Sequence, residues 1–356
     1  MIKVNAHKII NFGDATEATY FCLVTNSQLK DQFEINIEKK YKAYKIFSLD
    51  NADDFVALMK NDMPDNAHIL VVLPSVYFKP PPADLLGGQR KLGVLACSST
   101  PSDSESIQHF IRVAENTDPV AQDVFADRLF SLGEKTKHLL FYNKKTKTEA
   151  VFHHLYDHLS WHEQIGVLDW GQQQLLPSGE ISVLPVNVFD QNIEVALDVT
   201  GELTLQGTAI LHSGTPSFSP RDQQRIYEDL ATLNDDAVIA SLDGGHITSL
   251  KAASKKSFRA IRALEALMYT DSRYSTLLEI GLGVNTNHDL IAGNSAMNEV
   301  YGGKKGVIHL GFGLTPYTQY HLDILCPDTA LYTAEKEWIL GETAHLSDQI
   351  GEQVIG

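Results

Sequence analysis

The sequence has few cysteines, and they do not form a pattern. Only three occur among the 356 residues, Cys22, Cys97 and Cys326, and none forms a CxxC pair. An odd number at wide spacing excludes a disulfide framework and a cysteine zinc site. The opening MIKVNAHKIINFG also lacks the basic start, apolar centre and small-residue cleavage site of a signal peptide. Together these absences predict a protein of the reducing cytoplasm.

Long apolar runs and excess basic charge are also missing. The longest apolar run, His68–Phe78, is broken by Pro74 and is far too short to span a membrane. The formal net charge of −16 argues against nucleic acid and against an anionic membrane as partners. The hydrophobic content of 43% is that of an ordinary globular protein, and 356 residues exceed what one core usually holds. We therefore expect two domains.

The first part of the chain alternates strand-like and helix-like segments. Tyr20–Thr25, Ile69–Leu73 and Leu92–Cys97 are apolar runs rich in branched residues, which is typical of strands buried on both faces of a parallel sheet. Asp50–Lys60 and Ser102–Asn116 have helical spacing. This alternation predicts an α/β domain over residues 1–145.

Strand-like segments dominate the rest of the chain, which we assign to an α+β domain over residues 146–356, for an α/β fold class as a whole. From about Leu139 onward, the expected strands are Leu139–Tyr142, Ile181–Val188, Ile193–Asp198, Leu203–Leu205, Ala237–Leu242 and Val307–Phe312. Turns at Pro177–Gly179 and Asp243–Gly245 are expected to join strands as hairpins. Helices are expected over Ser219–Asn234, with Ser219 as its cap and Pro220 in its first turn, and over Ser254–Tyr269.

A metal site is indicated by His321-Leu322-Asp323. Alternate residues of a strand point to the same face, so this imidazole and this carboxylate converge. His309 lies in a second strand pattern, VIHLG. Two histidines and one carboxylate are a minimal ligand set for a divalent metal, although a single His-x-Asp pair is more often an ordinary hydrogen-bonded pair.

Two glutamates strengthen the metal interpretation. Glu180 follows a Pro-Ser-Gly turn and opens the run ISVLPV, and Glu279 lies within the apolar segment LLEIGLGV. A buried carboxylate needs a cation nearby, and a metal ion is one such cation. The alternatives are a salt bridge to Lys or Arg and exposure at a strand end.

Four stretches of sequence resemble, in the same order, motifs of the thermophilic aminopeptidases, the aminopeptidase T-like metallopeptidases. They are LLPSGEISVLPV, LLEIGLGVNTN, GNSAMNEVYGGKKGVIHLGFG and HLDIL. The resemblance covers roughly residues 165–328. It implies that Glu180, Glu279, His309, His321 and Asp323 are metal ligands, and that Glu299 lies near them but outside the ligand set.

The resemblance also implies an activity. Two divalent ions (zinc, manganese, cobalt or iron) would activate a water for hydrolysis of a peptide or small amide, with Glu180 as general base. Tyr317 would stabilise the oxyanion, with Tyr320 in reserve. The expected partner is a peptide or small-molecule substrate, and a homodimer is possible in such a family.

Two other functions stay open. A related branch of the same architecture resembles ring-cleaving dioxygenases of dihydroxypyridines, which hold one iron by two histidines and an aspartate, and His309, His321 and Asp323 suit that set equally well. A non-catalytic binding or accessory protein on the same scaffold is the third.

Other conspicuous residues have simpler interpretations. His154, His158 and His162 would line one face of a helix, and we interpret them as a polar helix edge rather than a zinc site. Gly281-Leu-Gly283 and Gly311-Phe-Gly313 are expected to let the backbone approach the site closely, not to bind phosphate. Cys326 is expected to be a packed core thiol.

Overall fold

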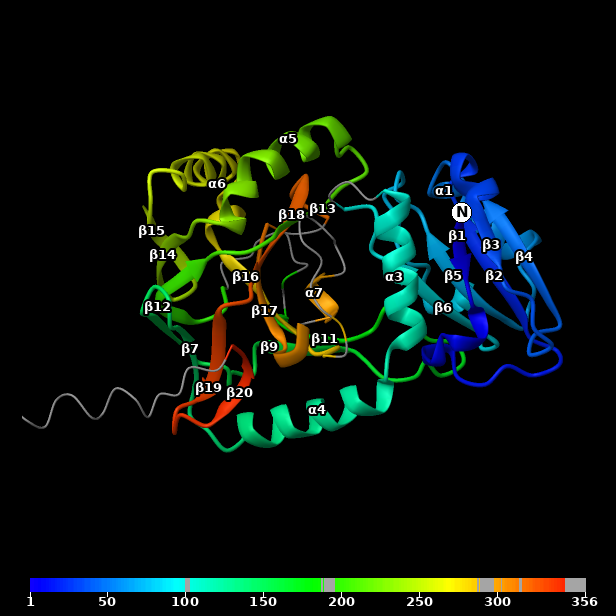
Figure 1. The fold of residues 1–356 in the computed structure, drawn as a ribbon, viewed down its shortest axis with the longest axis horizontal. Coiled ribbons are helices and arrows are strands. Elements are labelled where there is room, and N and C mark those ends of the chain that lie inside the picture. The colour runs from blue at the N-terminus through cyan, green and yellow to red at the C-terminus, as the bar shows by residue number, and fades with distance from the viewer. Residues whose placement is uncertain are drawn as a thin grey trace, which may run out of the picture.

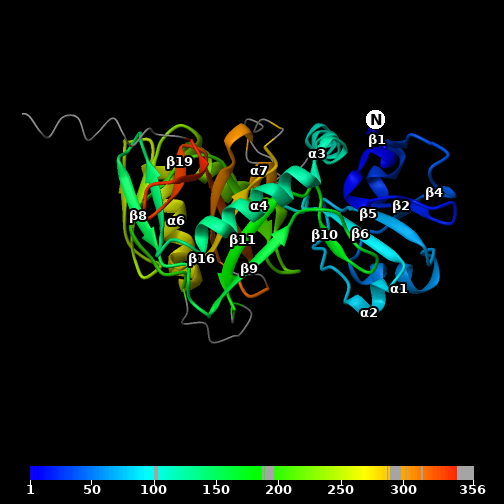
Figure 2. The ribbon, with the colours of Figure 1, turned by 90° about the horizontal axis from the view of Figure 1, so that it is seen from below.

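The computed structural model describes residues 1–99, 103–186, 188, 196–286, 288, 298–301, 303–313 and 316–342. The described chain has an α/β fold built from one parallel sheet and two larger antiparallel sheets (Figure 1). This confirms the predicted fold class. Seen from below in Figure 2, the parallel sheet lies at one end of the molecule and the antiparallel sheets at the other. No helix of the described chain is long and apolar enough to cross a membrane.

The parallel sheet is formed mainly by the first hundred residues. Its order is β10-β6-β5-β2-β4, with bounds Gln173–Leu175, Arg90–Leu95, Ala67–Val72, Tyr20–Thr25 and Ala43–Ser48. Helix α1 (Asp53–Asn61) and the short α2 (Ala83–Leu86) pack on one face, while α3 (Ser104–Asn116) packs on the other. A two-stranded parallel pair, β1 (Ile2–Val4) and β3 (Phe33–Ile35), joins α3 there. Because both faces are covered, the apolar runs predicted as buried strands are confirmed.

Two antiparallel sheets carry most of the remaining chain. The six-stranded sheet has the order β13-β18-β17-β16-β11-β9, with bounds Ala209–Ser213, Tyr320–Cys326, Val307–Phe312, Leu277–Gly283, Glu180–Pro185 and Leu159–Gln164. The seven-stranded sheet has the order β15-β14-β12-β8-β7-β19-β20, with bounds His246–Ala252, Val238–Asp243, Val199–Leu205, Thr148–Phe152, Leu139–Asn143, Thr329–Thr333 and Trp338–Gly341. Apolar side chains of both sheets meet in one core.

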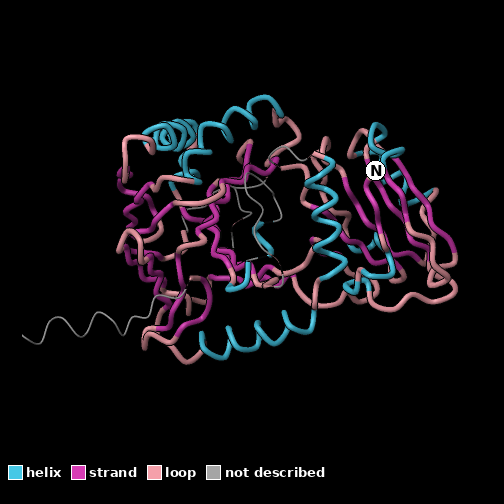
Figure 3. The backbone as a smooth tube through the Cα atoms, in the orientation of Figure 1, coloured by secondary structure: helices cyan, strands magenta, loops and turns pink. Residues whose placement is uncertain are grey.

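Four further helices complete the described fold (Figure 3). Helices α5 (Pro220–Leu230) and α6 (Phe258–Thr270) pack together and close one end of the core between the antiparallel sheets. Ser219 caps α5 as predicted, because its Oγ accepts the Asp222 amide at 3.3 Å. Helix α4 (Pro119–Gly133) runs beneath the sheets in Figure 1, and α7 is the single turn Asn298–Tyr301. Short 3-10 helices cover Ala6–Lys8, Ile10–Phe12, Ser27–Gln32, Ala231–Asn234, Ser272–Ser275 and Gly303–Lys305.

Two local predictions are wrong, and one helix has no counterpart among the predicted elements. The turn at Pro177–Gly179 does not close a hairpin, because β10 before it pairs with β6 in the parallel sheet and β11 after it joins the six-stranded sheet. The histidine-rich segment is no helix: it leaves β8 and continues into β9. Helix α4 was not expected, because Val120 and Val124 on it are 69% and 64% exposed and blur its apolar stripe. The turn at Asp243–Gly245 does close a hairpin, β14–β15.

The predicted domain boundary stays a prediction. A cut between residues 145 and 146 falls inside the β7–β8 hairpin, whose strands pair from Leu139↔Phe152 to Asn143↔Thr148. Of the predicted strand Ile193–Asp198, residues 193–195 lie outside the described residues, and Ala196–Asp198 form a loop before β12 rather than a strand.

The start of α4 offers a test of the fold. Asp118 accepts hydrogen bonds from the Val120 and Ala121 amides at 3.1 and 3.2 Å, and Pro119 occupies the first helical position. We expect Asp118→Ala to lower the free energy of unfolding by about 1 kcal/mol, because two amides lose their acceptor. Asp118→Asn should preserve most of that stability in urea denaturation. Equal losses in both variants would contradict the capping role.

Candidate metal centre

The predicted ligands collect on one face of the six-stranded sheet. On β18, Leu322 and Ile324 point into the core between the antiparallel sheets, so His321 and Asp323 point to the opposite face. On β17, Ile308 and Leu310 are core residues and His309 lies on the ligand face. Glu180 of β11 and Glu279 of β16 lie on this face as well. The structure therefore brings all five predicted ligands together.

Glycine occupies the positions across from these ligands. Gly281 is the register partner of His309, and Gly311 is the partner of both Glu279 and Asp323. A Cβ at Gly281 would overlap the His309 ring, and one at Gly311 would lie 2.6 Å from the Glu279 Cβ and 2.9 Å from Asp323 Oδ1. The expectation that these glycines allow close approach is confirmed. The missing side chains leave the space that the ligand side chains fill.

Two further residues, His212 and Glu299, complete the cluster. His212 lies on β13 directly across from His321, and Glu299 lies on α7. The His212 Nε2 atom is 3.0 Å from Glu299 Oε2 and 3.1 Å from Asp323 Oδ2. Sequence reasoning missed His212, which directly follows the apolar run Ala209–Leu211. Neighbouring residues of a strand point to opposite faces, so His212 points away from the core that contains Leu211. Glu299, which was expected near the ligands but outside their set, lies in the same side-chain cluster as His212 and Asp323.

The seven side chains form three overlapping groups that are suited to metal binding. The groups are His212, Glu299 and Asp323; Glu279, His321 and Asp323; and Glu180, Glu279 and His309. Asp323 is shared by the first two, because its Oδ1 lies 3.1 Å from His321 Nε2 while its Oδ2 faces His212. Glu279 links the last two, since its Oε2 lies 3.2 Å from His321 Nε2. Adjacent groups that share a carboxylate suit two neighbouring ions.

Electrostatics within the cluster are dominated by buried carboxylates. Burial raises the pKa of Glu180 well above its usual range, and the negative charges of Glu279 and Glu299 add to this. Burial alone would lower the pKa of His212, but Glu299 and Asp323 raise it to about 10. Burial alone would also lower the pKa of His321, but Asp323 raises that pKa well above its usual value. In the metal-free protein both imidazoles are therefore protonated on both ring nitrogens, and their positive charge partly neutralises the carboxylates.

Hydrogen bonds on the far side of the rings orient two of the histidines. Ser99 Oγ lies 2.6 Å from the Ala96 carbonyl oxygen and 2.7 Å from His212 Nδ1. A hydroxyl has one proton, which here is donated to the carbonyl, so Ser99 accepts from the Nδ1–H of His212. His321 Nδ1 donates to the Gly313 carbonyl at 3.2 Å. Both rings thus present Nε2 to the cluster, the orientation that a metal ligand requires.

Glu180 is positioned by the turn before it. The buried Ser178 accepts from Asn11 Nδ2 at 2.7 Å and donates to Gln122 Oε1 at 2.8 Å. Its carbonyl accepts from Gln122 and from Asn285 at 3.0 and 3.1 Å. The turn therefore contacts the N-terminal segment, α4 and the end of β16, and it delivers Glu180 to the first position of β11.

The donor set fits a divalent metal. Asp323, Glu299 and Glu180 are 2%, 4% and 6% exposed. In the part of the chain that the structure describes, the ion pairs of the four carboxylates are with histidines. His309 Nε2 lies 3.5 Å from Glu180 Oε1, and its buried Nδ1 has no hydrogen-bond partner among the residues that the structure describes. Clustered carboxylates around imidazoles need further positive charge, which a metal ion would supply.

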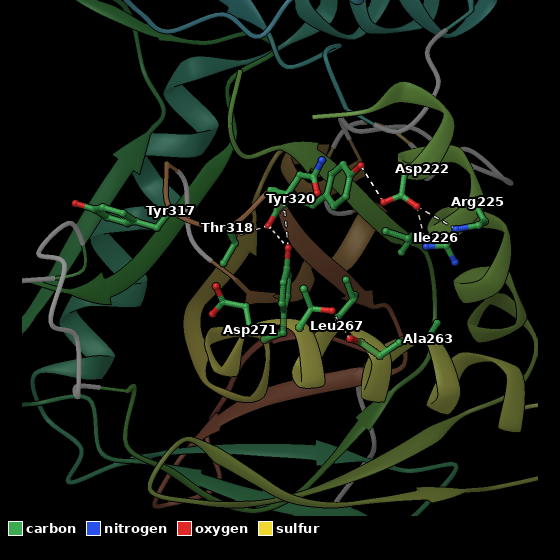
Figure 4. A pocket seen from close by; sticks show the side chains of 13 residues that line it. Asp222, Arg225, Ile226, Ala263, Leu267, Asp271, Tyr317, Thr318 and Tyr320 are labelled. Carbon is green, nitrogen blue, oxygen red and sulfur yellow. Dashed lines mark hydrogen bonds and ion pairs between the residues drawn. The ribbon is translucent and has the colours of Figure 1, made fainter. Parts of the chain in front are cut away.

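Of the two tyrosines considered for oxyanion stabilisation, one lies on the wrong face of the sheet. Tyr320 is unsuited, because it occupies the opposite face of β18 from His321 and its hydroxyl bonds Ser219 and Asp222 on α5 (Figure 4). Tyr317 points away from Tyr320 in Figure 4, and its ring packs against Leu278 and beneath the Arg273 guanidinium. The catalytic role of Tyr317 stays a prediction.

The remaining conspicuous residues have structural roles. His154 is buried and its Nε2 contacts the Gly133 carbonyl at 2.9 Å. Because His158 precedes β9 and His162 lies within it, the helical spacing of these histidines has no structural counterpart. Cys326 is 1% exposed within the core, and burial raises the pKa of its thiol to about 12, as expected for a packing residue.

The Ser99–His212 hydrogen bond can be tested by metal affinity. We expect Ser99→Ala to weaken metal binding about 10-fold to 100-fold, because the His212 ring loses the acceptor that fixes its orientation. Ser98→Ala is the matched control, since the Ser98 hydroxyl bonds Ser213 and not a histidine. Competition with a chromogenic chelator measures both affinities. Equal affinities in the two variants would rule out the orienting role.

Metal binding is expected to depend on pH. His212 and His321 are protonated in the metal-free protein and must lose their protons to bind metal, so apparent affinity should rise from about pH 6.5 to about pH 10. The same raised pKa values stabilise the metal-free fold below pH 6.5, and this stability is lost as pH rises through 10. Titration calorimetry in buffers of different ionisation enthalpy measures the released protons. Uptake without proton release at pH 7 would contradict these protonation states.

Comparison with known proteins supports the fold. No family model and no curated protein sequence matches this chain. Among solved structures, it is similar to 2,5-dihydroxypyridine dioxygenase from Pseudomonas putida KT2440, with a TM-score of 0.57 and 12% identity over 95% of this chain and 96% of that one. It also matches wild-type AmpT from Thermus thermophilus, with a TM-score of 0.49 and 11% identity over 93% of this chain and 97% of that one. The chain thus shares an α/β fold with the dioxygenase over nearly its whole length.

Proposed function

We propose that this protein is a metal-dependent hydrolase that uses two divalent ions to cleave a peptide or small amide next to its free amino group. The observation that carries the proposal is the placement of Asp323. Its two carboxylate oxygens face different histidines, His212 at 3.1 Å and His321 at 3.1 Å. A carboxylate with a separate imidazole on each oxygen is suited to bridge two ions.

The other carboxylates support two ions over one. Glu299 belongs to the His212 side of the cluster and Glu279 to the His321 side, so each side has its own terminal carboxylate. Four carboxylates and three histidines offer more donors than one ion with open positions would use. The ligand mix suits zinc, manganese, cobalt or iron.

The residues would divide the work of hydrolysis. Bound ions supply Lewis acidity, which polarises the amide carbonyl and lowers the pKa of a water. The proposed general base is Glu180, at the first position of β11. It would take the proton of that water and pass it to the leaving amine. Carboxylates of the cluster would hold the positively charged amino group of the substrate. Tyr317 is the proposed oxyanion donor.

A second candidate function is oxidative ring cleavage with one iron. Asp323 lies between His212 and His321, whose ring centroids are 5.9 Å apart, and two histidines with one carboxylate form the facial set of many iron oxygenases. Because the chain shares its fold with a dihydroxypyridine dioxygenase, a dihydroxypyridine is the substrate with which to test this function. Against it, Glu279 and Glu299 also face these histidines, where an oxygenase needs open positions.

Metal content separates these functions. We expect close to two divalent ions per chain by elemental analysis under non-chelating conditions, falling to one or fewer in Asp323→Asn because both sides lose a shared ligand. One iron, with oxygen uptake on a dihydroxypyridine, would replace the hydrolase by the dioxygenase. No metal after incubation with zinc, manganese and cobalt would indicate a binding protein on this scaffold.

Hydrolysis itself is tested at Glu180. Glu180→Gln should lower the turnover number on amino-acid p-nitroanilides about 10²-fold to 10⁴-fold, because the general base is removed. Glu163→Gln is the matched control, since Glu163 is exposed on the neighbouring strand β9 across from Ile181. An unchanged rate in Glu180→Gln would exclude it as the base.

A further inference from the structure

A cavity of about 160 Å³ adjoins the metal centre from the side of the parallel sheet. Its walls come from the carboxyl ends of β5 and β6, the segments that follow them, and the end of β13. His212, a member of the ligand cluster, lies in its wall. Ligands of open α/β sheets bind at the carboxyl ends of parallel strands, so this is a natural place for a substrate group.

The lining of the cavity is apolar in character. Eight of its residues are Val71, Leu73, Phe78, Pro80, Val94, Leu95, Ala96 and Leu175. The hydroxyls in the wall bond within it: Ser98 and Ser213 bond each other at 2.9 Å, and Ser99 donates to the Ala96 carbonyl. Among the described residues, the lining includes no Lys, Arg, Asp or Glu. A carboxylate placed among these apolar side chains would lose hydration and would find no lysine or arginine to pair with.

The size of the cavity limits its occupant. An apolar protein cavity of about 150 Å³ is large enough to bind benzene. The cavity beside His212, at about 160 Å³, therefore holds one six-membered ring or one branched chain of about four carbons. A methyl group would leave most of it empty.

The position of His212 relates the cavity to the reacting atoms. The Nδ1 side of its ring bonds Ser99 in the cavity wall, and its Nε2 faces Glu299 and Asp323. The cavity and the carboxylates are thus separated by about the width of one imidazole ring. A substrate whose amino group and scissile carbonyl lie at the carboxylates can place the side chain of the same residue in the cavity.

We propose that this cavity is the subsite for an apolar side chain at the amino-terminal position of the substrate. The substrate class is then peptides or amides that begin with leucine, phenylalanine or a residue of similar size and character. This inference rests on the proposed hydrolase function. The N-terminal part of the chain would then help to select the substrate, because β5 and β6 line the cavity.

The test compares cavity variants of the metal-loaded protein. The substrates are L-leucinamide, L-phenylalaninamide, L-alaninamide and L-glutamic acid α-amide, and both binding by calorimetry and kcat/KM are measured. Wild type should favour leucinamide and phenylalaninamide over alaninamide by about 10-fold or more, because each buried methylene adds to binding. The glutamic acid amide should be the poorest substrate.

Ala96→Phe fills the cavity and should remove this preference, while metal content checks that the metal centre is retained. Ala18→Phe is the control, since Ala18 is exposed in a loop of the N-terminal part. Phe78→Ala is a second variant that enlarges the cavity and should shift the preference toward L-tryptophanamide. An unchanged preference in both cavity variants would overturn the inference.

The outcomes separate the subsite from the hydrolase. Leucinamide that binds wild type but not Ala96→Phe, and that is never hydrolysed, would keep the subsite and exclude the hydrolase. Alaninamide hydrolysis with no gain in binding or kcat/KM for leucinamide would keep the hydrolase and exclude the subsite.

Discussion

The repulsion among four buried carboxylates is the constraint on which this structure depends. Glu180, Glu279, Glu299 and Asp323 are held within one cluster, where burial and the negative charges of the other three raise the pKa of Glu180. Protonated imidazoles of His212 and His321 relieve part of that cost, which explains the raised pKa values of both rings. Divalent cations would relieve more, since they replace the protons with higher charge density. The ligand geometry and the proposed chemistry follow from this one need for positive charge.

The sheets accommodate the cluster in two ways. They place an apolar core behind it, and they place glycines across from the cluster side chains. Core residues alternate with ligands along β17 and β18, so the same strands provide stability on one face and polar groups on the other. Gly281 and Gly311 provide the space across the sheet. The N-terminal part then contributes Ser99 behind His212 and the cavity beside it. Both parts of the chain are thus needed for one site.

A site residue could be predicted from sequence where a local pattern identifies it, and not where only the pairing of distant strands brings it to the site. His321 and Asp323 were identified because strand alternation places them on one face, and Glu279 because a carboxylate stands alone in an apolar run. His212 was missed because it closes a short strand that was not anticipated, and only the pairing with β18 brings it to Asp323. The turn before Glu180 was misjudged because turn chemistry reports a change of direction but not which sheet receives each strand. Glu299 lies on a single helical turn, whose placement depends on tertiary packing.

The chain passes from one sheet to the other within very few residues. Leu175 is still paired with Val94 in the parallel sheet, while Glu180 already begins β11 in the antiparallel one. Ser178, between them, is anchored to Asn11, Gln122 and Asn285. A displacement of Leu175 would therefore reach Glu180 through four residues that these hydrogen bonds hold in place. The proposed subsite, whose wall includes Leu175, and the proposed base Glu180 are thus separated by only four residues of the chain.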